Sequence, residues 1–186
     1  MQEIKEGIAH ITDFDGYDHM LYLVALCAPF VLRDYMKVVV LATAFTVGHS
    51  ITLAASASGI LRFSSDLVEM LISISIGITG LANLVMKDQV LRWWHYIITI
   101  GFGLIHGMGF STYFRMMYSH ESDWIWRLFQ FNIGVELGQL LIISVILLAS
   151  FFAVNTFKLA QAYWKQGLSW IAIIMSGYLI LEKIIA

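Results

Sequence analysis

The sequence is poor in charged residues, in cysteine and in proline. Asp, Glu, Lys and Arg make up 13% of its 186 residues, about half the share found in soluble domains. The formal net charge of −2 provides no basic surface for nucleic acid. The single cysteine, Cys27, excludes an internal disulfide and any cysteine-based zinc site. With Pro29 as the single proline, the helices have few places to break.

The composition is instead that of a membrane protein. Hydrophobic residues make up 59% of the chain, and the mean hydropathy is +0.77. Six apolar stretches are close to the roughly 17–25 residues that cross a bilayer as a helix, and the first is the shortest. They are residues 17–32, 38–56, 67–85, 95–113, 128–154 and 168–184. The prediction is an all-α, polytopic membrane helix bundle with about six transmembrane helices, forming a single transmembrane domain over residues 1–186.

A short helix is expected before the first apolar stretch. Ile4, Ile8 and Ile11 are spaced i, i+4 and i+7, so residues 2–12 are predicted to form an amphipathic helix at the membrane interface. The sequence does not begin with a basic segment followed by an apolar run and a cleavage site, so no cleavable signal peptide is expected. The Lys and Arg residues of the connecting segments are divided almost evenly between the two sides of the membrane. Their distribution weakly favours an N-terminus outside the cytoplasm.

Several ionisable residues fall where the chain is expected to cross the bilayer. They are His49, Glu69, His106 and Glu136, joined by Asp18 and His19 at the start of the first stretch. An ionisable group at membrane depth costs at least a few kcal/mol, so such residues normally face the bundle interior and serve a function. Imidazoles together with carboxylates are ligands of divalent metals. The pattern therefore predicts a shared metal site inside the bundle.

One of these residues lies on a stripe along a single helical face. The stripe consists of Glu69, Ser73, Ile76, Gly80 and Asn83, separated by four, three, four and three residues. Close packing against another helix explains the small residues, and a Glu about one turn inside the span could also remain at the interface. Packing alone does not explain a carboxylate, so the metal site is the preferred interpretation of Glu69.

The stretch 128–154 carries a similar pattern around Glu136, with Gln139 on the same face. Gly134 and Gly138 form a GxxxG pair on the neighbouring face, which predicts a close helix contact. Glu136 lies about two turns inside the span, and its side chain is too short to reach the interface. A functional role is therefore predicted for it.

The membrane histidines have two interpretations when each is taken alone. A single histidine is often a neutral hydrogen-bonding partner between helices. The glycines around His106 are favourable only if another helix or a ligand approaches the backbone, since each costs roughly 1 kcal/mol in a helix. Three histidines and several carboxylates on separate helices favour one shared site. His95, at a span edge, and His120, in a loop, are left out of it.

The polar residues fall within five ordered blocks of sequence. The blocks GxxHI…GYDHMLY, TAFTVGHSITL, VEMLISISI, FGLIHGMGF and FNIGVELGQ resemble the signature blocks of the HupE/UreJ family of bacterial membrane proteins. Members of that family are accessory proteins of hydrogenase and urease operons and are regarded as nickel or cobalt permeases. This chain is more similar to a broader subgroup whose members have no assigned substrate. The resemblance implies a multi-pass protein of the bacterial inner (cytoplasmic) membrane.

The resemblance also implies a set of metal-binding residues. By position these are His10, Asp18, His19, His49, Glu69, His106 and Glu136. The chain departs from the family pattern in one place, because TDFD lies between His10-Ile11 and Gly16 and lengthens the first block. The longer spacing leaves open whether His10 reaches the same place and whether the metal is nickel.

Three functions are compatible with these residues. The first is a permease for Ni²⁺, Co²⁺ or Zn²⁺, in which imidazoles and carboxylates replace part of the hydration shell of the ion. The second is an intramembrane metal-dependent hydrolase, with a metal-activated water and Glu69 or Glu136 as the general base. The third is an assembly or accessory protein whose metal only joins helices. Polar residues at several depths favour the permease.

The expected partners follow from these hypotheses. They are the lipid bilayer and a divalent metal ion, without nucleic acid. The sequence leaves open whether copies of the chain form a homo-oligomer.

Overall fold

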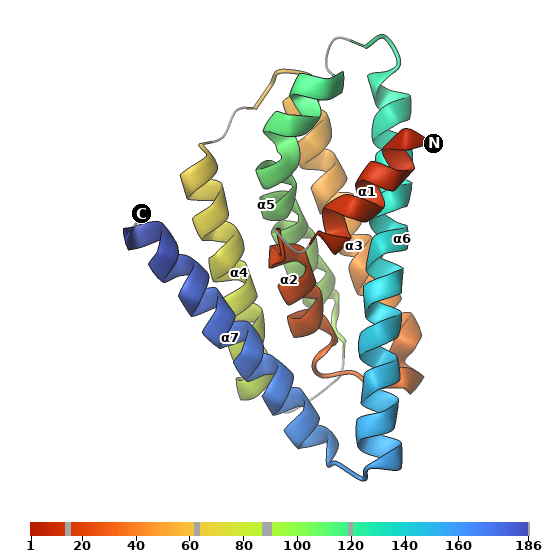
Figure 1. The fold of residues 1–186 in the computed structure, drawn as a ribbon, viewed down its shortest axis with the longest axis vertical. Coiled ribbons are helices and arrows are strands. Elements are labelled where there is room, and N and C mark those ends of the chain that lie inside the picture. The colour runs from red at the N-terminus through yellow and green to blue at the C-terminus, as the bar shows by residue number, and fades with distance from the viewer. Residues whose placement is uncertain (14–15, 62–63, 87–90, 119–120, 186) are drawn as a thin grey trace.

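The protein is a bundle of helices, most of which run along its long axis (Figure 1). A computed structural model describes residues 1–13, 16–61, 64–86, 91–118 and 121–185, and these residues include no strand. In chain order the elements are α1 (Gln2–Thr12), α2 (Asp18–Cys27), η1 (Leu32–Asp34), α3 (Tyr35–Ala57), α4 (Ser65–Val85), α5 (Trp93–Tyr118), α6 (Trp124–Phe151), η2 (Phe152–Thr156) and α7 (Gln161–Ile185). The all-α class predicted from the sequence is confirmed.

Five segments are long and apolar enough to cross a membrane. They are Leu32–Ala57, Ser65–Val85, Trp93–Tyr118, Trp124–Thr156 and Gln161–Ile185. The first combines η1 with α3, and the fourth combines α6 with the π-helical segment η2. These segments correspond to five of the six stretches predicted from the sequence. The protein is therefore a multi-pass membrane protein whose outer surface contacts lipid.

The remaining predicted stretch forms a short helix inside the bundle. Helix α2 has 10 residues and is about 15 Å long, half the thickness of a hydrocarbon core. It ends at Cys27, two residues before Pro29, which has no N–H to continue a helix. The Asn83 side chain of α4 donates a hydrogen bond of 2.7 Å to the Ala25 carbonyl in the last turn. The first stretch is therefore a half-length buried helix, and the full spans number five among the described residues.

Helix α1 packs tightly on α6 through glycines (Figure 1). A Cβ atom on Gly7 would collide with the Phe131 carbonyl, and a Cβ on Gly134 would collide with the Ile4 carbonyl. The predicted GxxxG pair thus does make a close helix contact, and its partner is the N-terminal helix. The residues that α1 buries are Glu3, Gly7 and Ile11. Of the three isoleucines in the predicted apolar face, Ile11 is buried and Ile4 and Ile8 are partly exposed.

A second glycine contact joins α3 to α5. A Cβ atom on Gly107 would lie 2.5 Å from the His49 carbonyl, so any larger residue would push the two helices apart. Thr52 of α3 also donates a hydrogen bond of 2.8 Å to the Leu104 carbonyl of α5. The expectation that a helix approaches the glycines near His106 is met here. This close contact brings His49 and His106 into the same region of the interior.

The polar stripe of α4 packs against α7. Ser176 donates a hydrogen bond of 2.7 Å to the Ser73 carbonyl, and the backbone of Gly77 lies against the Ser176 side chain. At one end of this contact, Glu69 forms an ion pair with Lys183. The stripe is therefore a packing seam, as the sequence allowed, and its carboxylate has a cation as partner.

Candidate metal centre

Three histidines from three helices meet inside the bundle. His10 lies in the last turn of α1, His19 in the first turn of α2, and His49 in the middle of α3. One ring nitrogen from each lies within 4.8 Å of the corresponding nitrogens of the other two. The ring centroids are 4.5 Å apart for His10 and His19, and 5.6 Å apart for His10 and His49. We call these three residues the histidine cluster.

The nitrogens of the histidine cluster are buried and lack protein partners. Nε2 of His10, Nε2 of His19 and both ring nitrogens of His49 make no hydrogen bond to the described residues. A buried polar atom without a partner costs about 1–3 kcal/mol, and here such atoms gather at one point. Burial, followed by the proximity of His19 and His49, lowers the pKa of His10 well below 6.5. The His10 ring is therefore neutral near pH 7, as metal binding requires.

Asp18 orients one ring of the cluster. Its Oδ1 lies 2.9 Å from Nδ1 of His19 and accepts a hydrogen bond of 2.8 Å from the backbone N–H of the same residue. The carboxylate therefore places the proton on Nδ1, so the lone pair of His19 is on Nε2, the atom without a partner. A carboxylate behind a ligating histidine is the usual arrangement in metal sites.

His106 lies beside the histidine cluster as a fourth imidazole. It is fully buried, and its ring centroid is 5.0 Å from that of His19. Its Nε2 lies 3.0 Å from the hydroxyl of Ser75 on α4, while its Nδ1 has no partner. His106 is thus positioned by α4 and adds a further free nitrogen next to the cluster.

A cavity of about 520 Å³ adjoins the histidine cluster. It lies at the end of the bundle where α4 begins and α7 ends, as Glu69, Glu182 and Lys183 in its wall indicate. His10 and His19 are part of the same wall. We call this space the histidine cavity. It gives a small hydrated solute access to the cluster from one end of the bundle.

The two glutamates of the predicted site lie apart from the cluster. Glu69 is in the wall of the histidine cavity, where it pairs with Lys183 and accepts a hydrogen bond of 2.7 Å from Ser65. Glu136 of α6 contacts α3, accepting hydrogen bonds of 2.5 Å from Thr43 and 2.8 Å from Thr46. Thr46 is one turn before His49 on α3. Glu136 therefore braces the helix that carries a histidine of the cluster.

The comparison with protein families agrees with the blocks seen in the sequence. The family described as HupE / UreJ protein matches residues 1–182 of the 186 in the chain. The chain belongs to the HupE/UreJ family. The comparison with curated proteins found no match, and the comparison with solved structures found none either.

The sequence left open whether His10 reaches the other predicted residues, and in this HupE/UreJ protein it lies in the histidine cluster. The contact of α1 with α6 holds His10 independently of the connection to α2, because Gly7 and Gly134 fix the position of the helix. Asp13 ends the described part of the connection, and Asp15 lies outside the described residues. His120 lies outside them as well, and His95 accepts a hydrogen bond of 2.9 Å from the Arg92 N–H.

Sequence reasoning missed the residues that support the site from neighbouring helices. These are Ser75 beside His106, Thr43 and Thr46 on Glu136, and Lys183 on Glu69. A signal existed only for Thr43 and Thr46, which precede His49 on the same helix at intervals of three residues. Ser75 and Lys183 become partners only through the packing of α4 against α5 and α7.

Proposed function

We propose that this HupE/UreJ protein is a permease for a divalent transition-metal ion such as Ni²⁺, Co²⁺ or Zn²⁺ in the bacterial cytoplasmic membrane. His10, His19 and His49 bind the ion on its way through the bundle. The observation that carries this proposal is the meeting of three imidazoles from three helices beside a cavity, each with a ring nitrogen that has no partner among the described residues. Nitrogen ligands suit these ions, whereas Mg²⁺ and Ca²⁺ prefer oxygen.

The three histidines have to move closer together to bind one ion. Two nitrogens that bind one ion tetrahedrally, with bonds of about 2.1 Å, are about 3.4 Å apart. The three nitrogens lie within 4.8 Å of one another, so the widest gap has to close by up to about 1.4 Å, estimated from that geometry. The site therefore combines ready ligands with the incomplete closure that lets a transported ion leave.

The other predicted site residues take supporting roles in this proposal. Asp18 fixes the tautomer of His19, and His106 offers a fourth nitrogen next to the cluster. Glu69 lies on the approach, in the wall of the histidine cavity. Glu136 holds α3 through its threonine contacts. The metal is the cargo of the protein.

The test is metal binding and uptake by the purified protein. Wild type, His49→Ala, His106→Ala and His120→Ala are compared for Ni²⁺, Co²⁺ and Zn²⁺ bound at equilibrium and for uptake into proteoliposomes. We expect His49→Ala to weaken binding by at least about tenfold, as loss of ligand support commonly does, and His106→Ala to weaken it less. His120→Ala is the control, since the sequence places His120 outside every polar stripe. Equal metal content in all four proteins would overturn the metal-site proposal.

A metal-dependent hydrolase is the second candidate, because three histidines with an adjoining cavity also resemble a catalytic zinc site with an open position. The carboxylate of Glu69 lines the same cavity, but its ion pair with Lys183 occupies it. A general base has to be free to accept a proton. The same experiment separates the two functions, since bound metal without uptake would favour the hydrolase.

A further inference from the structure

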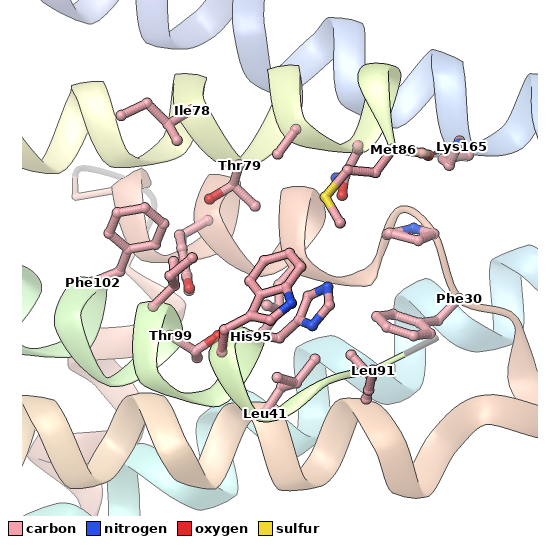
Figure 2. A pocket seen from close by; sticks show the side chains of 17 residues that line it. Phe30, Leu41, Ile78, Thr79, Met86, Leu91, His95, Thr99, Phe102 and Lys165 are labelled. Carbon is pink, nitrogen blue, oxygen red and sulfur yellow. Dashed lines mark hydrogen bonds between the residues drawn. The ribbon is translucent and has the colours of Figure 1, made fainter. Parts of the chain in front are cut away.

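A second cavity enters the bundle from the opposite end. It has a volume of about 150 Å³ and lies where α4 ends and α5 begins, with Met86 and Leu91 in its wall (Figure 2). The histidine cavity lies where α4 begins, near Glu69. Because α4 runs the length of the bundle, the two cavities approach the interior from its two ends.

The side chain of Tyr22 lies between the second cavity and His106. Tyr22 is 1% exposed and lines the second cavity, and it follows His19 by three residues on α2. Its ring centroid is 5.0 Å from that of His106, so it contacts the fourth imidazole directly. The ring is stacked on Phe45 at 4.9 Å and meets Phe102 edge-on at 6.0 Å. The layer between the histidines and the second cavity is therefore aromatic at Tyr22.

Beyond Tyr22 the wall of the second cavity is mostly apolar and carries a few polar groups. Thr79, Thr99, His95 and Lys165 lie in its wall (Figure 2). Asn83 lines it as well, with its amide bonded to the Ala25 carbonyl. Such groups give partners to water and to a hydrated ion, whereas an apolar ring excludes both. From one end to the other, the bundle thus contains the histidine cavity, the histidines, an aromatic layer, and a mostly apolar second cavity with a few polar groups.

We propose that Tyr22 is the barrier between the histidine cluster and the second cavity, and that displacement of its ring completes a metal path through the bundle. The proposal rests on the proposed permease function. In this structure the histidines are accessible from the histidine cavity and closed toward the second cavity. The second cavity lies directly against the ring and leaves space beside it. A metal ion that reaches the histidines stays bound to them until the Tyr22 ring moves.

The first test compares metal flux with metal binding in three variants. Tyr22→Ala removes the ring, Tyr22→Phe keeps it, and Phe114→Ala removes an equally buried aromatic that lines neither cavity. We expect Tyr22→Ala to raise the rate of metal uptake into proteoliposomes by about tenfold, because the ring is proposed to limit passage. The amount of bound metal should stay within about twofold of the wild-type amount. Tyr22→Phe and Phe114→Ala should keep the wild-type rate. An unchanged rate in Tyr22→Ala would overturn the proposal.

The second test leaves Tyr22 unchanged, so it can be carried out even if the Tyr22→Ala protein does not fold. In a Cys27→Ser background, Ser73→Cys places a thiol in the histidine cavity and Thr79→Cys places one in the second cavity. A membrane-impermeant thiol reagent is added to one face of the membrane at a time. We expect Ser73→Cys to react from one face and Thr79→Cys from the other face alone. Reaction of Thr79→Cys from the histidine-cavity face, or from neither face, would contradict the barrier.

The two tests separate this proposal from the permease function on which it rests. If the wild type binds and takes up metal but Thr79→Cys reacts from the histidine-cavity face, the barrier is wrong and the permease stands. If the wild type takes up no metal, the permease is wrong. The thiol pattern then still decides whether Tyr22 closes the interior.

Discussion

At the scale of single residues, the site depends on side chains that hold the histidines in position. Asp18 is 28% exposed in its side chain, and it contacts both the ring and the backbone N–H of His19. This places the free lone pair on Nε2 without the need for another partner. A neutral imidazole has two tautomers, and the carboxylate selects the tautomer of His19 that leaves Nε2 free for a metal.

Asp18→Asn is therefore expected to weaken binding of Ni²⁺ or Zn²⁺ by about 10–100-fold, the range seen for such supporting residues. The amide keeps the shape of the side chain but removes the charge that polarises His19. The measurement is an equilibrium binding isotherm on the purified protein in detergent. Asp66→Asn is the matched control, since this exposed acid lies in the first turn of α4 and outside the wall of the histidine cavity. An Asp18→Asn protein with wild-type affinity would show that packing alone orients His19.

At the scale of helices, close contacts at glycines determine where the histidines of the cluster lie. Helix α1 carries His10 and is fixed to α6 at Gly7 and Gly134, where neither helix has room for a Cβ. The ion pair of Glu3 with Arg127, at 2.8 Å, adds a contact at the start of α1. Helix α1 does not span the membrane, yet it completes the histidine cluster.

Gly134→Ala is expected to displace α1 and so to weaken metal binding by about tenfold or more, as loss of a ligand's support does. The added methyl group would collide with the Ile4 carbonyl, and backbone cannot move aside as a flexible side chain can. The matched control is Gly177→Ala, because a Cβ at Gly177 has nothing within 4 Å. In a helix this control is stabilising or neutral, by up to about 1 kcal/mol. Metal binding and thermal unfolding are measured for both variants, and equal metal affinities would contradict the role of α1.

At the scale of the whole molecule, the histidine cluster joins the N-terminal part of the chain to the bundle. Helices α1, α2 and α3 each supply one histidine, while α1 packs chiefly on α6 and α3 on α5. A bound ion therefore links elements that otherwise rest on different neighbours. Any ligand that binds the folded state alone stabilises it by mass action.

Ni²⁺ or Zn²⁺ at 100 times its dissociation constant is thus expected to stabilise the wild type by about 2.7 kcal/mol. The apparent Tm of the purified protein in detergent should rise on addition of the metal. The His49→Ala protein should show no rise at the same concentration. Mg²⁺ serves as a second control, because it favours oxygen ligands and should leave the Tm of the wild type unchanged. Equal shifts with and without His49 would place the metal elsewhere in the molecule.

Much of the fold follows from local features of the sequence. The long apolar stretches fix five spans, since a backbone in lipid has to satisfy its hydrogen bonds within each helix. The cost of ionisable groups at membrane depth also singled out His49 and His106, which are 0% exposed. Gly134 and Gly138 predicted a helix contact, although the sequence did not show that α1 would be the partner.

The sequence by itself determined the membrane class, the helices and the polar residues that had to be explained, because each depends on local composition and period. Tertiary structure decided which of those residues meet. It brought His10 together with His19 and His49. It also formed the hydrogen bonds between Glu136 and the threonines of α3, and the ion pair between Glu69 and Lys183. The reason is physical: the relative positions of helices depend on contacts between residues far apart in the chain, such as Gly7 with Gly134, and no local pattern specifies those pairs.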